Sequence, residues 1–270
     1  MTQDVTVPAP AALAGEVFET LADKAALPLR AIAILGVLAG VYIGLGGVFA
    51  LVALAGADAL PYGVGQALAG TVFTLGLALV IVAGAELFTG NMLFAGPVAA
   101  GRIPLGQAAT ALTVVYLANF VGALILAGVV MAAGVHEAGD GAVGQAAIAL
   151  AQGKLGNGAL AMFASGVLAN MLVCAAVWMA AGGRTVSQKI AGLFLPVAAF
   201  VAMGLEHSVA NMYLLPYGWM VHSASGDGTG GFTLLAVAGN LLPATLGNMV
   251  GGALVALIYW QAYVKKTDPA

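Results

Sequence analysis

The chain has 270 residues, of which 62% are hydrophobic and only 7% are charged, and its formal net charge is −3. Soluble domains are normally about one quarter charged, so this composition excludes a soluble protein and predicts an integral membrane protein. The weakly acidic balance without a basic cluster gives no support for nucleic-acid binding. The single cysteine, Cys174, cannot form an internal disulfide or a metal cage, and no metal or other cofactor is expected.

The first 28 residues are predicted to form an amphipathic helix. Leu13, Val17 and Leu21 recur every four residues, which indicates a helix lying on the membrane surface or against the bundle. Acidic residues are spread through this segment, and a basic start followed by an apolar core is absent, so it does not resemble a signal peptide.

Six long apolar runs follow, and charged residues mark their ends. Each run is far longer than the roughly 10 residues of a barrel strand and shows no alternation, so the spanning elements are helices. The second run is interrupted by Glu86, and the fifth by Glu206 and His207. We therefore expect an all-α protein with six transmembrane helices, of which the second and fifth are broken. The runs are bounded by Arg30–Asp58, Asp58–Arg102, Arg102–Glu137, Lys154–Arg184, Lys189–Asp227 and Asp227–Lys265.

The basic residues between these runs predict the orientation of the chain. Of the eight Lys and Arg residues, only Lys154 falls on the outer side of the six-pass arrangement. Positive charge stays on the cytoplasmic side of a membrane, so both termini are predicted to be cytoplasmic in a multi-pass inner-membrane protein.

The two interruptions are copies of one element. Gly84–Met92 and Gly204–Met212 both have the pattern G-x-E-x-x-x-x-N-M, and matching short motifs begin at Gly36 and at Gly166. Asn119-Phe-Val-Gly in the third run likewise recurs as Asn-Met-Val-Gly in the sixth. Two homologous units of three passes each insert upside down relative to one another, and such inverted repeats place the working site at their interface near the midplane.

These observations divide the chain into three parts with two repeats in the middle part. The expected division is an N-terminal cytoplasmic helix (1–28), a channel domain (29–264) and a cytoplasmic tail (265–270), with repeat one at about 29–135 and repeat two at about 155–264.

The four residues shared by both interruptions are interpreted as scaffold. Glu86 and Glu206 are expected to accept hydrogen bonds from amides freed where the helices break, with a proton pathway as the alternative. Asn91 and Asn211, at equivalent positions, are expected to hold loop backbone. His207 has no counterpart in the first copy, and an ionisable residue inside a membrane is a functional candidate by default. Its alternative role is to cap a broken helix.

The motifs resemble those of the formate/nitrite transporter family. They are GAELFTGN in the second span, Ala169–Ala180 (ANMLVCAAVWMA) in the fourth and GLEHSVANM in the fifth. The resemblance implies an aquaporin-like protomer, assembly as a homopentamer with one pore in each protomer, and conduction of small monovalent anions of weak acids.

The resemblance also implies a set of pathway residues. His207 would be the central histidine, a hydrogen-bond or proton donor to the passing anion. Thr89 and Asn170 would orient His207 or the substrate, and Lys154 would raise the anion concentration at the outer mouth. A helix cap and a solvated lysine are the plainer alternatives for Thr89 and Lys154. The remaining implied residues are Leu87 and Phe88 in the first loop, and Phe73, Leu77, Val173 and Phe200 at two apolar constrictions, which helix packing alone would also explain.

The predicted function is passive or proton-linked transport of formate and/or nitrite across the lipid bilayer, with protons as partners. Hydrosulfide or short-chain carboxylates are alternative substrates within the same family. An aquaporin-like channel for neutral solutes is a further alternative, although Asn91 and Asn211 are followed by Met rather than by Pro-Ala. The chain has neither the H-E-x-x-H nor the G-x-S-x-G pattern, so an enzyme is not expected.

Overall fold

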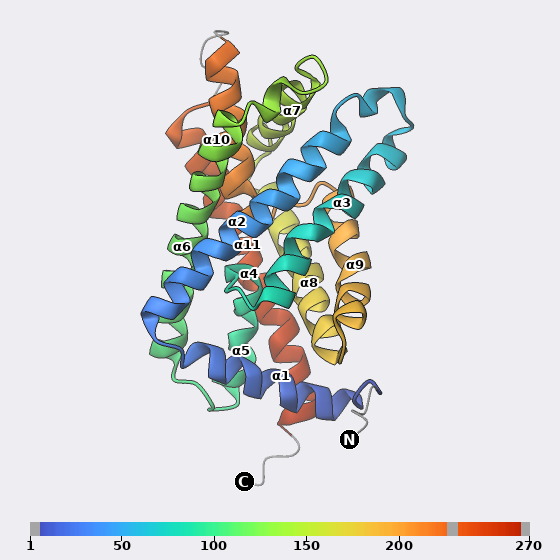
Figure 1. The fold of residues 1–270 in the computed structure, drawn as a ribbon. Helices are drawn as coiled ribbons and strands as arrows, with labels where there is room; N and C mark the ends of the chain where they lie inside the picture. The colour runs from blue at the N-terminus through green and yellow to red at the C-terminus, as the bar shows by residue number, and fades with distance from the viewer. Residues whose placement is uncertain (1–5, 226–231, 266–270) are drawn as a thin grey trace.

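The computed structural model describes residues 6–225 and 232–265, and these residues form a bundle of helices (Figure 1). Within these described residues, five helices are long and apolar enough to cross a membrane. Two shorter helices, α9 and α10, together form a sixth pass, so the number of passes agrees with the six that the sequence predicts. The unbroken spans are α2 (Leu29–Leu54), α6 (Leu105–Ala132), α8 (Ala159–Gly182) and α11 (Leu234–Tyr259). The helix before the first break is α3 (Tyr62–Ala83). After the first break come the short helices α4 (Phe88–Asn91), η2 (Met92–Phe94) and α5 (Ala95–Ala99). The second break lies between α9 (Val186–Ala202) and α10 (Ser208–Ser225). Helices outside the spans are α1 (Pro10–Ala25), η1 (Ala57–Ala59), η3 (Val135–Glu137), α7 (Ala142–Leu155) and the π-helical η4 (Trp260–Val264).

Both predicted breaks are present, and each follows a glycine. The chain leaves α3 at Gly84 (φ 75°) and α9 just before Gly204 (φ 67°). Only glycine enters this left-handed region without a steric penalty, so the glycine ends each helix at a defined residue. Three residues without helical structure follow in each copy, and a new helix then begins at Phe88 and at Ser208.

The two halves interlock through these breaks. In the first half α2 packs against α3 and α6, and in the second half α8 packs against α9 and α11. The arm α4 then contacts α8 and α11, whereas α10 contacts α6 and α2. Each broken element is therefore enclosed by spans of the opposite repeat, and the two breaks meet in the interior of the bundle (Figure 1).

Equivalent glycines bring the spans together in both halves. A Cβ atom at Gly122 would collide with the Val37 carbonyl, and one at Gly251 would collide with the Val167 carbonyl. Helices in lipid associate through such small residues because no hydrophobic effect drives them together. The repeated contact shows that the two units are built alike, as the sequence repeats predict.

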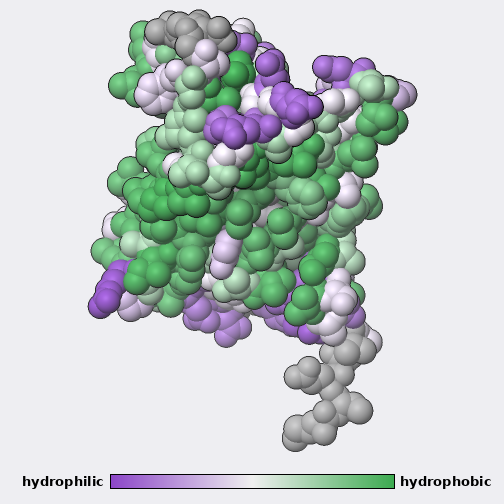
Figure 2. All heavy atoms as spheres, turned by 45° about the horizontal axis from the view of Figure 1, so that its top comes forward, coloured by the Kyte–Doolittle hydropathy of each residue, from purple (hydrophilic) through white to green (hydrophobic). Residues whose placement is uncertain are grey.

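The surface of the molecule fits a membrane protein. Figure 2 shows apolar side chains over much of the lateral surface and hydrophilic residues gathered at the ends. The helix α1 and the end of α11 lie together at one end, here called the terminal face, and α7 lies at the opposite end, the distal face (Figure 1). Helix α1 buries Leu13, Val17 and Leu21 against the bundle. The predicted tail, 265–270, lies outside the described residues apart from Lys265.

Candidate functional site

A hydrogen bond joins the two breaks at the centre of the bundle. The Thr89 hydroxyl lies 2.9 Å from Nε2 of His207, although the two residues are 118 positions apart in the chain. Both side chains are buried, with exposed fractions of 0% for Thr89 and 1% for His207. The residues that differ between the two copies of the interruption therefore form one polar site between the repeats.

The other nitrogen of His207 caps the helix α10. Nδ1 accepts the backbone N–H of Ala210, the third residue of α10, at 3.0 Å. A ring nitrogen that accepts a hydrogen bond carries no proton, so the neutral ring holds its proton on Nε2. In this geometry His207 donates from Nε2 to the Thr89 oxygen, which leaves the threonine hydroxyl hydrogen free to donate in turn. His207 therefore caps α10 through Nδ1 and contacts Thr89 through Nε2, and its role as a donor to an anion stays a prediction.

Two asparagines, one from each half, satisfy the amides freed at the breaks. Oδ1 of Asn119 accepts the N–H of Phe88 at 2.9 Å, and Oδ1 of Asn248 accepts the N–H of Ser208 at 2.8 Å. Each asparagine also donates to two carbonyls, one of which belongs to the glutamate of its own break. These asparagines therefore accept the hydrogen bonds of the freed amides, a role that was predicted from the sequence for Glu86 and Glu206.

The two glutamates instead bind side chains. Glu86 accepts from the Asn91 amide at 2.7 Å and pairs with the Lys24 ammonium at 3.0 Å. Glu206 accepts from Asn211 in the same way and pairs with Lys154 at 3.2 Å. Each residue is 1% exposed, and a buried carboxylate is strongly unfavourable unless it is paired. The hydrogen bond between Glu86 and Asn91 therefore joins the two ends of the first loop, and the bond between Glu206 and Asn211 does the same for the second.

Asn170 holds the first break from the side. Its Nδ2 donates to the carbonyl of Thr89 at 3.1 Å and to that of Asn248 at 2.6 Å, so both of its donors are used by backbone. Cys174, one turn further along α8, places its sulfur 3.6 Å from the same Thr89 carbonyl. The asparagine amide fixes the backbone that presents the Thr89 hydroxyl to His207.

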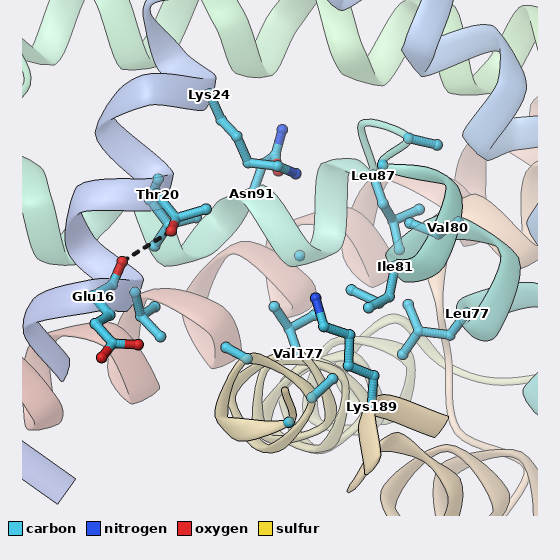
Figure 3. A pocket seen from close by; sticks show the side chains of 18 of the residues that line it. Glu16, Thr20, Lys24, Leu77, Val80, Ile81, Leu87, Asn91, Val177 and Lys189 are labelled. Carbon is cyan, nitrogen blue, oxygen red and sulfur yellow. Dashed lines mark hydrogen bonds between the residues drawn. The ribbon is translucent and has the colours of Figure 1, made fainter. Parts of the chain in front are cut away.

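Apolar side chains flank the polar centre on both sides. The ring of Phe200 stacks on His207 with centroids 5.5 Å apart, and the edge of Phe73 meets Phe200 at 5.6 Å. Leu77 and Leu87 lie on the other side and line a cavity of about 320 Å³ towards the terminal face (Figure 3). Val173 is buried in α8, and Phe88 turns its ring onto Tyr116 of α6, at a centroid distance of 4.9 Å.

The cavity on the terminal side lies between α1 and the ends of the spans. Side chains from α1, including Lys24, project into it opposite Lys189 of α9 (Figure 3). Arg184 also lines it and pairs with Glu16 of α1 through both carboxylate oxygens, at 3.0 and 2.9 Å. Helix α1 is thus attached to the bundle by ion pairs as well as by its apolar face.

Lys154 is placed differently from a solvated lysine at the mouth of a pore. Its side chain is only 10% exposed, and its ammonium contacts the Glu206 carboxylate and, at 3.4 Å, the Leu205 carbonyl. The sequence did not identify the further residues that contact Glu206, which are Asn157, Asn240 and Ser165. At the other break it did not identify Lys24, which was counted only as a topological charge. The spacing of Lys24 and Lys154, which equals that of Gly36 and Gly166, was an available signal.

If Phe200 forms a constriction, as the resemblance of the sequence implies, its replacement with alanine is expected to weaken the discrimination between solutes by size. The change removes the ring that covers His207, and apolar pockets discriminate by roughly 1–3 kcal/mol per methylene, or about 10- to 200-fold. We expect the acetate-to-formate flux ratio in proteoliposomes to rise by roughly tenfold within that range. Phe49→Ala on the outer surface of α2 is the matched control, since Phe49 is 46% exposed. An unchanged ratio in Phe200→Ala would show that Phe200 forms no constriction.

The protein is built as an inverted repeat within a membrane bundle, and its two polar helix breaks meet between apolar side chains. This arrangement defines a transmembrane transport protein for small solutes. The formate/nitrite transporter family matches residues 11–261, and the chain belongs to that family of channels and transporters, which are not enzymes. The formate channel FocA of Escherichia coli (strain K12) is 37% identical over 247 residues, 87% of each chain. The nitrite transporter NirC of the same strain is 36% identical over 234 residues, 86% of this chain and 83% of NirC.

Solved structures support the same assignment. A pentameric formate channel with formate bound superposes with a TM-score of 0.78 at 35% identity, covering 87% of this chain and 98% of that one. A channel described as an FNT family ion channel superposes with a TM-score of 0.81 at 31% identity, covering 93% and 98%. The described protein is therefore an all-helical, multi-pass channel-type transporter of this family.

Proposed function

We propose that this protein carries formate and/or nitrite across the inner membrane through a pore in each protomer of a homopentamer, with both termini in the cytoplasm. The contact between Thr89 and His207 carries the proposal, because it leaves the Thr89 hydroxyl hydrogen to donate to an anion where the repeats meet, with the Nε2–H of His207 beside it. The bound formate and the pentameric assembly of a structural relative support the substrate and the oligomer.

The pore centre would stabilise the anion with neutral donors. An uncompensated charge in an apolar environment costs tens of kcal/mol in a simple Born picture, so the anion needs hydrogen bonds between the constrictions. The Thr89 hydroxyl offers one, and the Nε2–H of His207 offers a second once the anion replaces the Thr89 oxygen as its acceptor; Asn170 and the cap on Ala210 hold both residues in place. Hydrogen bonds to charged groups are each worth about 1.5–3 kcal/mol, which favours the anion here over the flanking apolar positions.

Full proton transfer would require a further step at the same histidine. If Nε2 gave up its proton while Nδ1 accepted from Ala210, the ring would be left anionic, so Nδ1 would first have to be protonated. Protonation of Nδ1 breaks the cap on α10. The geometry therefore favours hydrogen-bond donation by His207, with any accompanying proton taken from solution, over a relay through the ring.

A comparison of substrates in proteoliposomes tests the proposed function. Stopped-flow measurements at several pH values would follow formate, nitrite, hydrosulfide, acetate, water and ammonium with the wild-type protein. We expect formate and nitrite fluxes well above those of protein-free liposomes. Hydrosulfide or acetate as the fastest substrate would reassign the substrate within the family, and flux of water and ammonium alone would identify a neutral-solute channel.

A further inference from the structure

The repeats include the helix that precedes each set of spans. Lys24 and Lys154 are 130 residues apart, the same spacing as Gly36 and Gly166 in the first spans of the two halves. Each lysine lies in the last turn of its helix, Lys24 in α1 and Lys154 in α7. The two helices lie at opposite ends of the molecule (Figure 1). Helix α1 is therefore the counterpart of α7, and each repeat begins earlier than the sequence analysis placed it.

The two lysines make the same contact. Lys24 pairs with Glu86 at 3.0 Å, and Lys154 pairs with Glu206 at 3.2 Å. In the first half the other carboxylate oxygen accepts the Asn91 amide, so Glu86 and Asn91 together span the loop that carries Leu87 and Thr89. Removing one partner of a buried ion pair strongly destabilises a protein, because the charge that remains is uncompensated.

The Lys24–Glu86 pair depends more on its lysine than the Lys154–Glu206 pair does. Glu206 also receives the amides of Asn240 at 3.3 Å and Asn157 at 3.5 Å. The position equivalent to Asn240 in the first half is Ala111, which offers no donor. Within the described residues, the side chains that contact the Glu86 carboxylate are those of Lys24 and Asn91.

We propose that Lys24 is a positioning residue for the pore centre. Through Glu86 it holds the loop that presents Thr89 to His207, so α1 is a working part of the pore rather than a peripheral attachment. This inference rests on the proposed function for its effect on flux. Its competitor is simple charge attraction, since Lys24 is 31% exposed at the side chain and lines the same cavity as Lys189.

Flux measurements on two lysine variants separate positioning from attraction. Lys24→Met is expected to lower formate flux by roughly tenfold, even at saturating formate and at high salt, since a displaced Thr89 is not restored by more substrate. Lys24→Met/Glu86→Gln should recover part of that flux, since the glutamine oxygen still accepts from Asn91 and no charge is left unpaired. The control Lys189→Met removes one positive charge from the same cavity, and its effect should be confined to low formate and low salt.

The only cysteine provides a second readout that charge attraction would not change. Cys174 is fully buried, and its sulfur lies 3.6 Å from the Thr89 carbonyl. Displacement of the loop should therefore raise the rate at which a small neutral thiol reagent labels Cys174 in Lys24→Met, but not in Lys189→Met. Thermal melting of each variant, compared with the wild type, separates local displacement from general unfolding.

Each outcome supports or overturns the inference. Faster labelling of Cys174 and a loss of flux that salt and substrate do not restore would support it. A Lys24→Met protein that matches Lys189→Met in flux and in labelling would overturn it in favour of charge attraction. If the wild-type protein carries neither formate nor nitrite, the proposed function fails, and the labelling rates still decide whether Lys24 positions the loop.

Discussion

Replacing His207 with phenylalanine is expected to lower formate flux by roughly tenfold to a hundredfold, because one hydrogen bond to a charged substrate is worth about 1.5–3 kcal/mol. The aromatic ring fills a similar space and can still stack on Phe200, but it has no donor for the anion. Stopped-flow formate uptake into proteoliposomes measures the loss. His222→Phe is the matched control, because His222 lies at the far end of α10, the helix that His207 caps.

A second variant at the same position separates the two tasks of the histidine. His207→Asn keeps a side-chain oxygen that can cap α10, since asparagine is a preferred capping residue, but the shorter side chain loses the Thr89 contact. We expect thermal stability closer to the wild type than that of His207→Phe, with a similar loss of flux. A folded His207→Phe protein with wild-type formate flux would falsify the donor role.

Replacing either bridging asparagine with leucine is expected to destabilise the protein by several kcal/mol. Asn248→Leu removes three buried hydrogen bonds, those to the Ser208 N–H and to the carbonyls of Gly166 and Glu206. An unsatisfied buried polar group costs about 1–3 kcal/mol, so the loss of three partners totals on the order of 3–9 kcal/mol. The expected fall in apparent melting temperature in detergent is on the order of 10 °C.

Asn119→Leu should have an effect of similar size, because Asn119 makes the equivalent three bonds at the other break. The control Gln145→Leu concerns an exposed amide residue of α7 and should shift stability by no more than about 0.5 kcal/mol. Wild-type melting temperatures for both asparagine variants would mean that water replaces the side chains, and the breaks would then not depend on these bonds.

Much of the architecture could be predicted from local sequence. The apolar runs fix the spans because a helix in lipid needs about 20 residues without charge. Gly84 and Gly204 fix the two breaks because the left-handed conformation favours glycine. The ordered repeats predict that the breaks face one another, and His207 was identified because an ionisable residue rarely lies inside a membrane without a function.

The partners of the polar groups were decided only by the tertiary structure. From the sequence, Glu86 and Glu206 were expected to accept the hydrogen bonds of the freed backbone amides. In the structure, the side-chain oxygens of Asn119 and Asn248 accept them. A hydrogen bond depends on a few tenths of an ångström between atoms that lie far apart in the chain, and spacing along the sequence does not contain this distance. The tautomer of His207 also depends on tertiary structure, because the Ala210 N–H donates to Nδ1 and so leaves the ring proton on Nε2.

The sequence by itself therefore determined a six-pass inverted repeat, its two helix breaks and the residue most suited to act on an anion. Only the tertiary structure decided that Lys24 reaches Glu86, and that the Thr89 hydroxyl rather than the Asn170 amide contacts His207. The physical reason is that burial in lipid is a property of whole segments, which composition records. Pairing of single polar atoms is a property of the packed bundle.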